Sequence, residues 1–312
     1  MKRKSKKQTS NHRLNLISMS LLMIVTVSCQ AQKNQTKAII ADGAQLTLVA
    51  DGFEFTEGPA ADKNGNVYFT DQPNDRILKW NAVDNTVSDY MKPSGRSNGL
   101  YFDNQGNLLT AADEKNEIWS IDVDKKVSVL LTSFDGKKFN GPNDLWVDAK
   151  GGIYFTDPYY QRPWWKHQEP QQKSKRVYYL APKSKTPIIV ADDNFDQPNG
   201  IIGTPNGKIL YVADQAGNKT YSYTIQKDGT LSNKKLFANL GSDGMTIDHL
   251  GNVYLTGKGV TVFNKKGEQI EHIAVPEDWT ANVTFGGSNQ KTLFITAMDS
   301  VYILEMAVHG VR

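Results

Sequence analysis

Cysteine is almost absent from this 312-residue chain, which contains a single one, at position 29. If the segment before this cysteine is a cleaved leader, the mature chain has no internal thiol. That excludes disulfide frameworks, cysteine-based metal sites and cysteine nucleophiles. Histidine is also scarce: the five histidines show no metal-ligand spacing. A metal site in this chain would therefore rest on oxygen ligands.

A sustained helical pattern is missing as well, because no window repeats its apolar residues with a helical period. β-branched and aromatic residues instead form short runs between turn-forming residues. The segment 139–158, FNGPNDLWVDAKGGIYFTDP, is the clearest example. It reads as a strand, a glycine-rich turn and a second strand. Such a unit leaves two open edges and cannot fold alone, so copies of it are expected elsewhere in the chain.

Five further copies of this unit occur, and each of the six opens with a residue that carries a side-chain oxygen. Their opening residues are 41, 45, 56, 44 and 39 residues apart: Glu57, Asn98, Asn143, Asn199, Asp243 and Asn282. Six units of this length, each with two clear strands and a fainter outer pair, predict an all-β, six-bladed β-propeller. We expect strands at 44–50 and 301–306 to share the last blade, because the ring of blades would otherwise have an open seam.

The first 29 residues do not fit the repeat. Six basic residues precede a mostly apolar stretch at 14–27, which is too short to span a membrane comfortably. This is the layout of a secretory signal. Residues 1–29 resemble a bacterial lipoprotein signal, in which Cys29 is lipidated and becomes the mature N-terminus; cleavage near Ala31 and a retained membrane anchor are the alternatives. We expect an exported, lipid-anchored periplasmic or outer-membrane lipoprotein, with a tether at 30–43 and the propeller at 44–308.

The basic leader also biases the charge of the chain. The formal charge of +3 becomes about −3 once its six basic residues are set aside. The remaining chain shows no basic stripe interleaved with aromatic residues, so no nucleic-acid partner is expected. We expect a monomer that contacts a membrane only through its lipid.

The six opening residues would form a ring at one depth, because the first strand of each propeller blade lines the central channel. Two carboxylates and four amide oxygens around one axis are ligands that a hard divalent cation prefers. A +2 charge would also offset the cost of burying Glu57 and Asp243. Turn formation by Asn-Gly and Asp-Gly is the alternative explanation for the same residues, although Glu57 is a weak turn former.

Four longer stretches resemble the SMP-30/gluconolactonase/LRE-like family: FTEGPAADKNGNVYFTD, NGPNDLWVDAKGGIYFTDP, QPNGIIGTPNGKILYVAD and SDGMTIDHLGNVYLTG. The resemblance runs from about residue 48 to residue 306. It implies a metal-dependent hydrolase that opens a sugar-derived lactone, with one divalent cation held by Glu57, Asn143, Asn199 and Asp243. Ca²⁺ is the expected cation, and Mg²⁺, Mn²⁺ and Zn²⁺ are the alternatives.

The resemblance also suggests catalytic roles. A divalent cation would polarise the lactone carbonyl and activate water. Asp243 is the candidate base, Asp144 or Asp196 acting through water is the fallback, and Asn143 would share the developing charge. Asn98 and Asp144 are expected to contact the substrate. An aromatic insertion at 159–175 is interpreted either as a floppy loop or as a rim over the pocket. In the second case Tyr159, Tyr160, Trp164 and Trp165 would form the contact surface, with Trp164 and Trp165 as the expected substrate contacts.

Two other functions stay open at this point. An aryl-ester or organophosphate hydrolase would use the same site, and a non-catalytic propeller would bind a glycan or a protein around a structural Ca²⁺. The sequence GRSNG at 95–99 matches the G-x-S-x-G pattern of serine hydrolases. That motif requires a helix after the serine, and here a strand pattern follows, so Ser97 is not expected to be a nucleophile.

Overall fold

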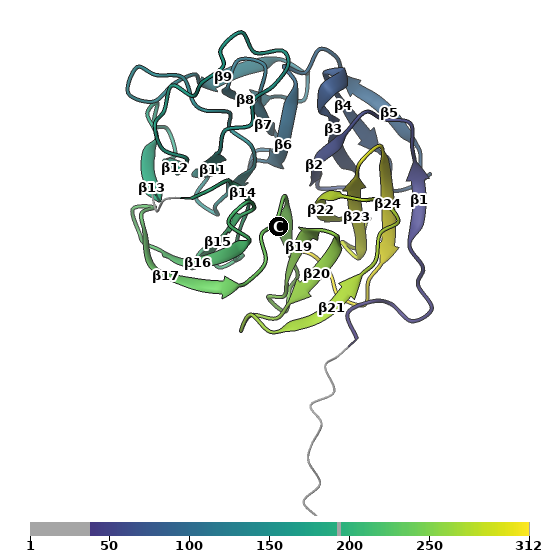
Figure 1. Cartoon of the computed structure of the whole chain (residues 1–312). Helices are drawn as coiled ribbons and strands as arrows, with labels where there is room; N and C mark the ends of the chain where they lie inside the picture. The colour runs from purple at the N-terminus through teal and green to yellow at the C-terminus, as the bar shows by residue number, and fades with distance from the viewer. Residues whose placement is uncertain (1–37, 192–194, 312) are drawn as a thin grey trace, which may run out of the picture. The chain divides into compact units, whose positions relative to one another are not determined.

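The computed structural model describes residues 38–191 and 195–311. These residues form six four-stranded antiparallel sheets around a common centre, which confirms the predicted six-bladed β-propeller (Figure 1). Apart from the 3₁₀ turn η1 (Gln72–Asn74), no helix occurs in the described ranges, and none there could cross a membrane. The predicted signal segment and Cys29 lie outside the described residues.

Each of the first five blades is built from four consecutive strands, numbered from the centre outward. They are β2 (Thr56–Ala61), β3 (Val67–Asp71), β4 (Arg76–Trp80) and β5 (Val87–Met91); β6 (Ser97–Phe102), β7 (Leu108–Ala112), β8 (Glu117–Ile121) and β9 (Val127–Leu131); β10 (Leu145–Val147), β11 (Ile153–Asp157), β12 (Arg176–Leu180) and β13 (Ile188–Ala191); β14 (Pro198–Gly203), β15 (Ile209–Asp214), β16 (Lys219–Ile225) and β17 (Leu231–Ala238); β18 (Met245–Ile247), β19 (Val253–Gly257), β20 (Gly259–Phe263) and β21 (Gln269–Ile273).

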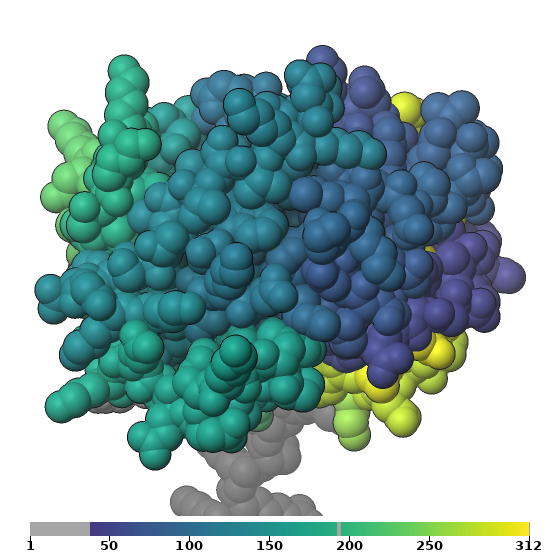
Figure 2. Space-filling model, turned by 90° about the horizontal axis from the view of Figure 1, so that it is seen from above, coloured from purple at the N-terminus to yellow at the C-terminus, as the bar shows by residue number. Residues whose placement is uncertain are grey.

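The sixth blade joins the two ends of the folded body, as predicted. Its inner strands are β22 (Thr280–Gly286), β23 (Thr292–Ala297) and β24 (Ser300–Glu305), and its outer strand is β1 (Thr47–Ala50). Thr47 pairs with Ile303, and Leu48 pairs with Tyr302. Figure 2 shows the purple N-terminal residues of the body beside the yellow C-terminal ones. This pairing covers the edge of β24 and closes the ring of blades.

Both ends of the body extend beyond the boundaries that the sequence suggested. Ile39 is buried, and Ile40 forms a β-bridge with Met306. The last residues of the predicted tether, 30–43, therefore pack on the sixth blade, because an apolar pair there removes surface from water. At the other end, Gly310 bridges to Asp248 of the fifth blade.

The second strand of each blade carries most of the core. In β3, Val67 and Phe69 are completely buried, and in β15 so are Leu210 and Val212. Each blade is covered by a neighbour on both faces, so these strands need no polar side, which explains apolar runs such as VYFTD and IYFTD. The outer strands alternate or are exposed, as in β5.

An aspartate fixes the turn between the first two strands in several blades. Asp103 is an example: its Oδ1 accepts hydrogen bonds from the backbone N–H groups of Gln105 at 2.9 Å and Asn107 at 2.8 Å. Gly106 has φ 87°, a conformation that a side chain disfavours. These short turns set the register of the hairpins and so the depth of each innermost strand.

The closure of the sixth blade gives a testable prediction. A variant that lacks residues 1–50 should unfold about 10 °C or more below a variant that lacks only residues 1–37. The longer deletion removes β1 and the buried Ile39, and it leaves the edge of β24 unpaired. Thermal unfolding followed by circular dichroism measures the difference. Equal midpoints for the two deletions would show that β1 does not hold the ring closed.

Candidate active site at the propeller axis

The six opening residues, called the ring residues below, lie at the inner end of the six blades. Four of them are in innermost strands, and two lie two residues before one: Glu57 in β2, Asn98 in β6, Asn199 in β14 and Asn282 in β22, with Asn143 before β10 and Asp243 before β18. Five are buried, and Asp243 is partly exposed. The axis therefore offers an almost closed polar floor that is open beside Asp243.

The glycines that follow four of the ring residues are needed for close packing around the axis. A Cβ atom added to Gly244 would lie 1.9 Å from Cγ of Asn282, the next ring residue. Glycines at equivalent positions meet the backbone of the next blade in the same way: Gly58, Gly99 and Gly200. Asn98-Gly99 and Asn199-Gly200 lie inside strands, so turn formation does not explain these pairs.

Hydrogen bonds connect the ring residues to one another. Nδ2 of Asn199 donates to Oδ1 of Asp243 at 2.6 Å, and Nδ2 of Asn282 donates to Oε2 of Glu57 at 3.1 Å. On the far side of Asp243, Nε1 of Trp279 donates to Oδ2 at 2.7 Å. The Asp243 carboxylate also contributes to the raised pKa of Glu57. Residues from the first, fourth, fifth and sixth blades therefore converge on one polar cluster.

Burial and mutual repulsion raise the pKa values of the carboxyl groups at the axis. Burial, followed by the Asp243 carboxylate, raises the pKa of Glu57 well above its ordinary value. Burial also raises the pKa of Asp243, although hydrogen bonds from Trp279 and Asn199 oppose this. Burial raises the pKa of Asp144 to about 7. Three acids thus share a site in which their charged forms are costly.

The unpaired oxygens at the axis fit a bound cation. Oδ1 of Asn98 and Oδ1 of Asn199 are buried and accept no hydrogen bond from any described residue. Buried polar atoms normally have a partner. Since two acceptors and two carboxylates face one axis, the donor set suits a hard divalent ion. Within residues 38–191 and 195–311, no cluster of three or more His, Cys, Asp or Glu side chains is arranged for a metal, so amide oxygens would have to complete the set.

A long loop between β11 and β12, residues 158–175, covers the same end of the propeller and is called the mouth loop below. The Tyr160 hydroxyl accepts a hydrogen bond from Nδ2 of Asn199 at 3.1 Å. Arg162 Nε donates to Oδ2 of Asp113 at 2.8 Å. The loop therefore spans from the fourth blade to the second, directly above the ring residues. Its position favours the rim interpretation over a floppy loop.

The structure places the four predicted substrate contacts differently from one another. Asn98 is a ring residue, and Asp144 follows the ring residue Asn143. Trp164 lies in the mouth loop with its ring 4.5 Å from the Arg96 guanidinium. Trp165 is buried, and its Nε1 donates to the Asp113 carbonyl oxygen at 2.7 Å. Trp165 thus anchors the mouth loop rather than presenting a free surface.

Trp279 contacts a ring residue although the sequence did not single it out. It lies in the segment PEDWT at 276–280, which the sequence favours as a simple turn. Tyr160 was expected in the aromatic rim, and its contact to the ring residue Asn199 was not. The short distance from Trp279 to Asp243, 36 residues earlier, follows from the junction of two blades. The only signal in the sequence for this contact was a tryptophan at the junction between two blades, one of which carries the carboxylate of Asp243.

Ser97 does not form a serine-hydrolase elbow. It lies within β6, and its hydroxyl donates to the Ser94 carbonyl oxygen at 2.7 Å. No helix follows it, as expected from the sequence.

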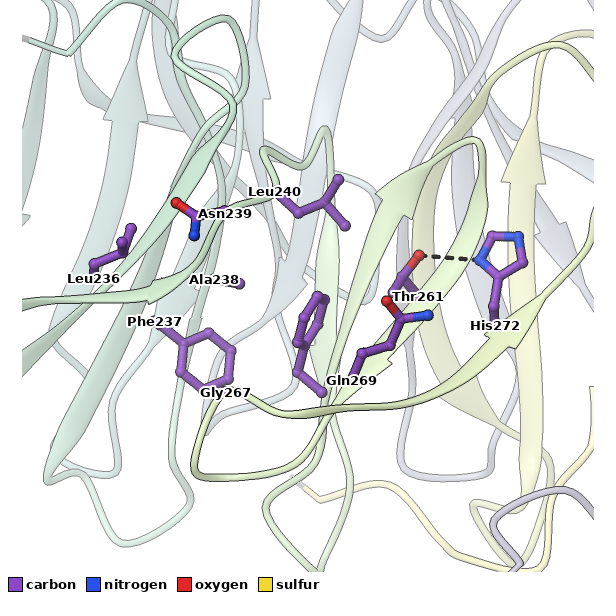
Figure 3. A pocket seen from close by; sticks show the side chains of 10 residues that line it. Leu236, Phe237, Ala238, Asn239, Leu240, Thr261, Gly267, Gln269 and His272 are labelled. Atoms are coloured by element: carbon purple, nitrogen blue, oxygen red, sulfur yellow. Dashed lines mark hydrogen bonds between the residues drawn. The ribbon is translucent and has the colours of Figure 1, made fainter.

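An outer groove between the fourth and fifth blades is separate from the axis. It has a volume of about 540 Å³ and is lined by residues of β17, β20 and β21, with no ring residue among them (Figure 3). Thr261 Oγ1 and His272 Nδ1 are hydrogen-bonded to each other at 3.1 Å on its floor. None of the residues that line the groove carries a carboxylate, so the axis is the better candidate for the active site.

The fold and the axis together define a six-bladed propeller with an oxygen-lined polar centre. Residues 55–299 match the SMP-30/Gluconolactonase/LRE-like region, and the chain belongs to this family. The resemblance noted in the sequence is thereby confirmed.

Three relatives illustrate the range of this similarity. A gluconolactonase of Zymomonas mobilis is 29% identical over 95% of this chain and 95% of its own length. A diisopropyl-fluorophosphatase of Loligo vulgaris is 26% identical over 80% of this chain and 88% of its own. A solved gluconolactonase structure from Xanthomonas campestris aligns with a TM-score of 0.79 at 29% identity, over 86% of this chain and 91% of that one.

The packing of Gly244 gives a prediction about the axis. Gly244→Ala should lower the thermal midpoint clearly more than Gly136→Ala. At Gly136 the only cost of an added Cβ is the positive φ of 70°, because no other atom lies within 4 Å. At Gly244 the added Cβ overlaps Asn282. Overpacking of this kind costs about 1–3 kcal/mol or more. Equal losses in the two variants would contradict the close approach of the innermost strands.

The raised pKa of Asp144 gives a prediction about pH. The folded state holds a proton near pH 7 that the unfolded chain releases near 3.8, so this contribution to stability is present at low pH and is lost as pH rises through about 7. In the presence of a chelator, the thermal midpoint of the wild type should therefore fall more steeply between pH 3.8 and about pH 7 than that of Asp144→Asn. Asp51→Asn, at an exposed position, is the control and should follow the wild type. Parallel profiles for all three proteins would contradict the assignment.

Proposed function

We propose that this chain is a hydrolase that opens a sugar-derived lactone, with one divalent cation at the propeller axis. The observation that carries the proposal is the convergence of Glu57 and Asp243 with the unpaired amide oxygens of Asn98 and Asn199. Membership of a family with gluconolactonase relatives supports the choice of a lactone. Glu57, Asn143, Asn199 and Asp243 would hold the cation, with Ca²⁺ as the first candidate.

Hydrolysis of a lactone requires a water oxygen to attack the carbonyl carbon while the bond to the ring oxygen breaks. A bound divalent cation would supply positive charge for the developing oxyanion and would lower the pKa of a water molecule. The ring amides of Asn98 and Asn143 would orient the substrate. The water proton passes to a carboxylate and then to the departing ring oxygen, which becomes a hydroxyl group.

Two carboxylates are candidates for this proton transfer. Asp243 is the first candidate from the sequence, but both of its oxygens already accept hydrogen bonds, from Asn199 and Trp279. Asp144 lies beside the ring with a pKa raised to about 7, which suits exchange of a proton at neutral pH. Asp196, a further fallback, is exposed and outside the polar cluster. We therefore propose Asp144 as the alternative base to Asp243.

An aryl-ester or organophosphate hydrolase is the second candidate function. The similarity to a diisopropyl-fluorophosphatase over 80% of this chain favours it, and it would use the same ring residues. Export, lipidation of Cys29 and a monomeric state also remain proposals, and the first two concern residues outside the described part of the chain.

The carboxylate at Glu57 provides the test of this function. Glu57→Gln should lower kcat/KM for D-gluconolactone by at least about 100-fold and should also abolish the increase in thermal midpoint that Ca²⁺ gives the wild type. Removing one carboxylate leaves the cation with a weaker ligand set and less charge compensation. Acid release followed with a pH indicator, with and without chelator, measures the first effect.

The control for this test is Glu54→Gln, an exposed carboxylate three residues away, which should behave like the wild type. Turnover of paraoxon but of no lactone would select the organophosphate hydrolase. Stabilisation by Ca²⁺ without turnover of any ester would instead support the non-catalytic propeller. Near-normal turnover by Glu57→Gln would refute the ring as the active site.

A further inference from the structure

An aspartate ends the second strand in three blades and has the same task in each. It accepts backbone N–H groups from the segment that leads into the innermost strand. The pairs are Asp71 with Glu54 and Phe55, Asp157 with Asn140 and Gly141, and Asp214 with Asp196 and Gln197. In the second blade Ala112 occupies this position, and Asp113 follows one residue later.

The carboxylate of Asp113 accepts hydrogen bonds from side chains rather than from backbone N–H groups. Its Oδ2 accepts from Nε2 of Gln72 at 3.0 Å and from Nε of Arg162 at 2.8 Å. The segment before β6 is fixed by a different residue, since Oδ1 of Asp75 accepts from the backbone N–H of Arg96 at 2.7 Å. Asp113 is 3% exposed, against 22% for Arg162. The carboxylate that follows β7 thus holds an arginine of the mouth loop.

The terminal nitrogens of Arg162 remain available. Only its Nε donates a hydrogen bond to a side chain or backbone in the part of the chain that the structure describes. Its guanidinium carbon lies 5.5 Å from the centre of the Tyr160 ring, and the hydroxyl of Tyr160 contacts the ring residue Asn199. The guanidinium is therefore held at the mouth, one aromatic side chain away from the polar cluster at the axis.

Other donors lie around the same point. The Trp164 ring contacts two guanidinium groups, that of Arg96 at 4.5 Å and that of Arg162 at 5.8 Å. The Nε1 atom of Trp164 is buried, and no described residue accepts its hydrogen bond. Buried donors that lack an acceptor are costly. The mouth thus presents several donors and positive charges but few acceptors, the opposite of the axis.

The charge of the mouth loop agrees with this arrangement. Residues 159–175 contain four basic side chains and one acidic one, whereas the chain after Cys29 carries about −3 in total. Such a local positive field attracts anions. A planar guanidinium also pairs with a carboxylate or a phosphate through two parallel hydrogen bonds.

We propose that Arg162, positioned by Asp113 and flanked by Trp164 and Arg96, forms a cationic subsite that binds a carboxylate or phosphate substituent of the substrate. The chain then prefers lactones of acidic sugars over neutral ones. This inference rests on the proposed lactone hydrolysis and names its substrate class. Arg162 determines specificity, and Asp113 is a positioning residue.

The test compares kcat/KM on three lactones: D-gluconolactone, which is neutral, D-glucarolactone, which carries a carboxylate, and phosphogluconolactone. The wild type should prefer at least one of the two acidic lactones, and the better one identifies the substituent. Arg162→Gln should reduce this preference at least about tenfold, mainly through KM. Arg162→Lys should keep part of it, because charge remains without the planar fork. Lys166→Gln, the same charge change at an exposed neighbour, should keep all of it.

Two results would overturn the subsite. One is an unchanged preference in Arg162→Gln; the other is an equal loss on neutral and acidic lactones, which would place the arginine on the product carboxylate or in the framework. Asp113→Asn guards against a folding artefact: in a protein with a wild-type circular dichroism spectrum, it should raise KM for the acidic lactone.

Absence of lactone turnover in the wild type would refute the proposed function without deciding the subsite. Calorimetric binding of D-glucarate and of sorbitol to the metal-loaded protein then decides it. Tighter binding of glucarate that Arg162→Gln abolishes supports the subsite. Equal glucarate binding by the two proteins, or none by the wild type, overturns it.

Discussion

The interaction on which the rest of this structure depends is the crowding of carboxyl groups at the propeller axis. Glu57 and Asp243 come from blades that are far apart in sequence, yet their carboxyl groups act on each other, and Asp144 lies nearby. In a buried site this arrangement is unfavourable unless protons or a cation compensate the charge. The amide oxygens without partners point to a cation. A bound divalent ion would therefore reduce the repulsion between these buried carboxylates.

The propeller fold maintains this crowding because its innermost strands cannot move apart independently. Four of the six inner strands pack on the next through a glycine, and the pairing of β1 with β24 closes the circle. A loss of closure at the sixth blade would therefore reach the axis, although no residue of β1 touches the site. The mouth loop adds a second layer: it joins the second and fourth blades above the ring residues, and it brings positive charge toward the carboxylates below.

Most of the fold could be predicted from the sequence, because six similar units of strand, turn and strand repeat at nearly even spacing. The same periodicity predicted that six oxygen-bearing side chains open the innermost strands, and the structure has them in or just before these strands. Trp279 and Tyr160 could not be predicted to reach the ring, since their contacts depend on how loops cross between blades. The task of Asp113 was equally hidden: it lies one residue beyond the position of Asp71 and Asp157 in the repeat, and its role follows only from its contacts to Gln72 and Arg162. The signal segment and the lipidation of Cys29 stay predictions.

Anomalous diffraction from a crystal grown with Mn²⁺ tests the central claim most directly, because it locates a cation without reference to turnover. The account predicts one strong peak per chain on the propeller axis, about 2.0–2.6 Å from side-chain oxygens of Glu57, Asn143, Asn199 and Asp243. A peak only at another place would contradict it. So would an axis that contains water and no Mn²⁺ in a crystal at saturating Mn²⁺.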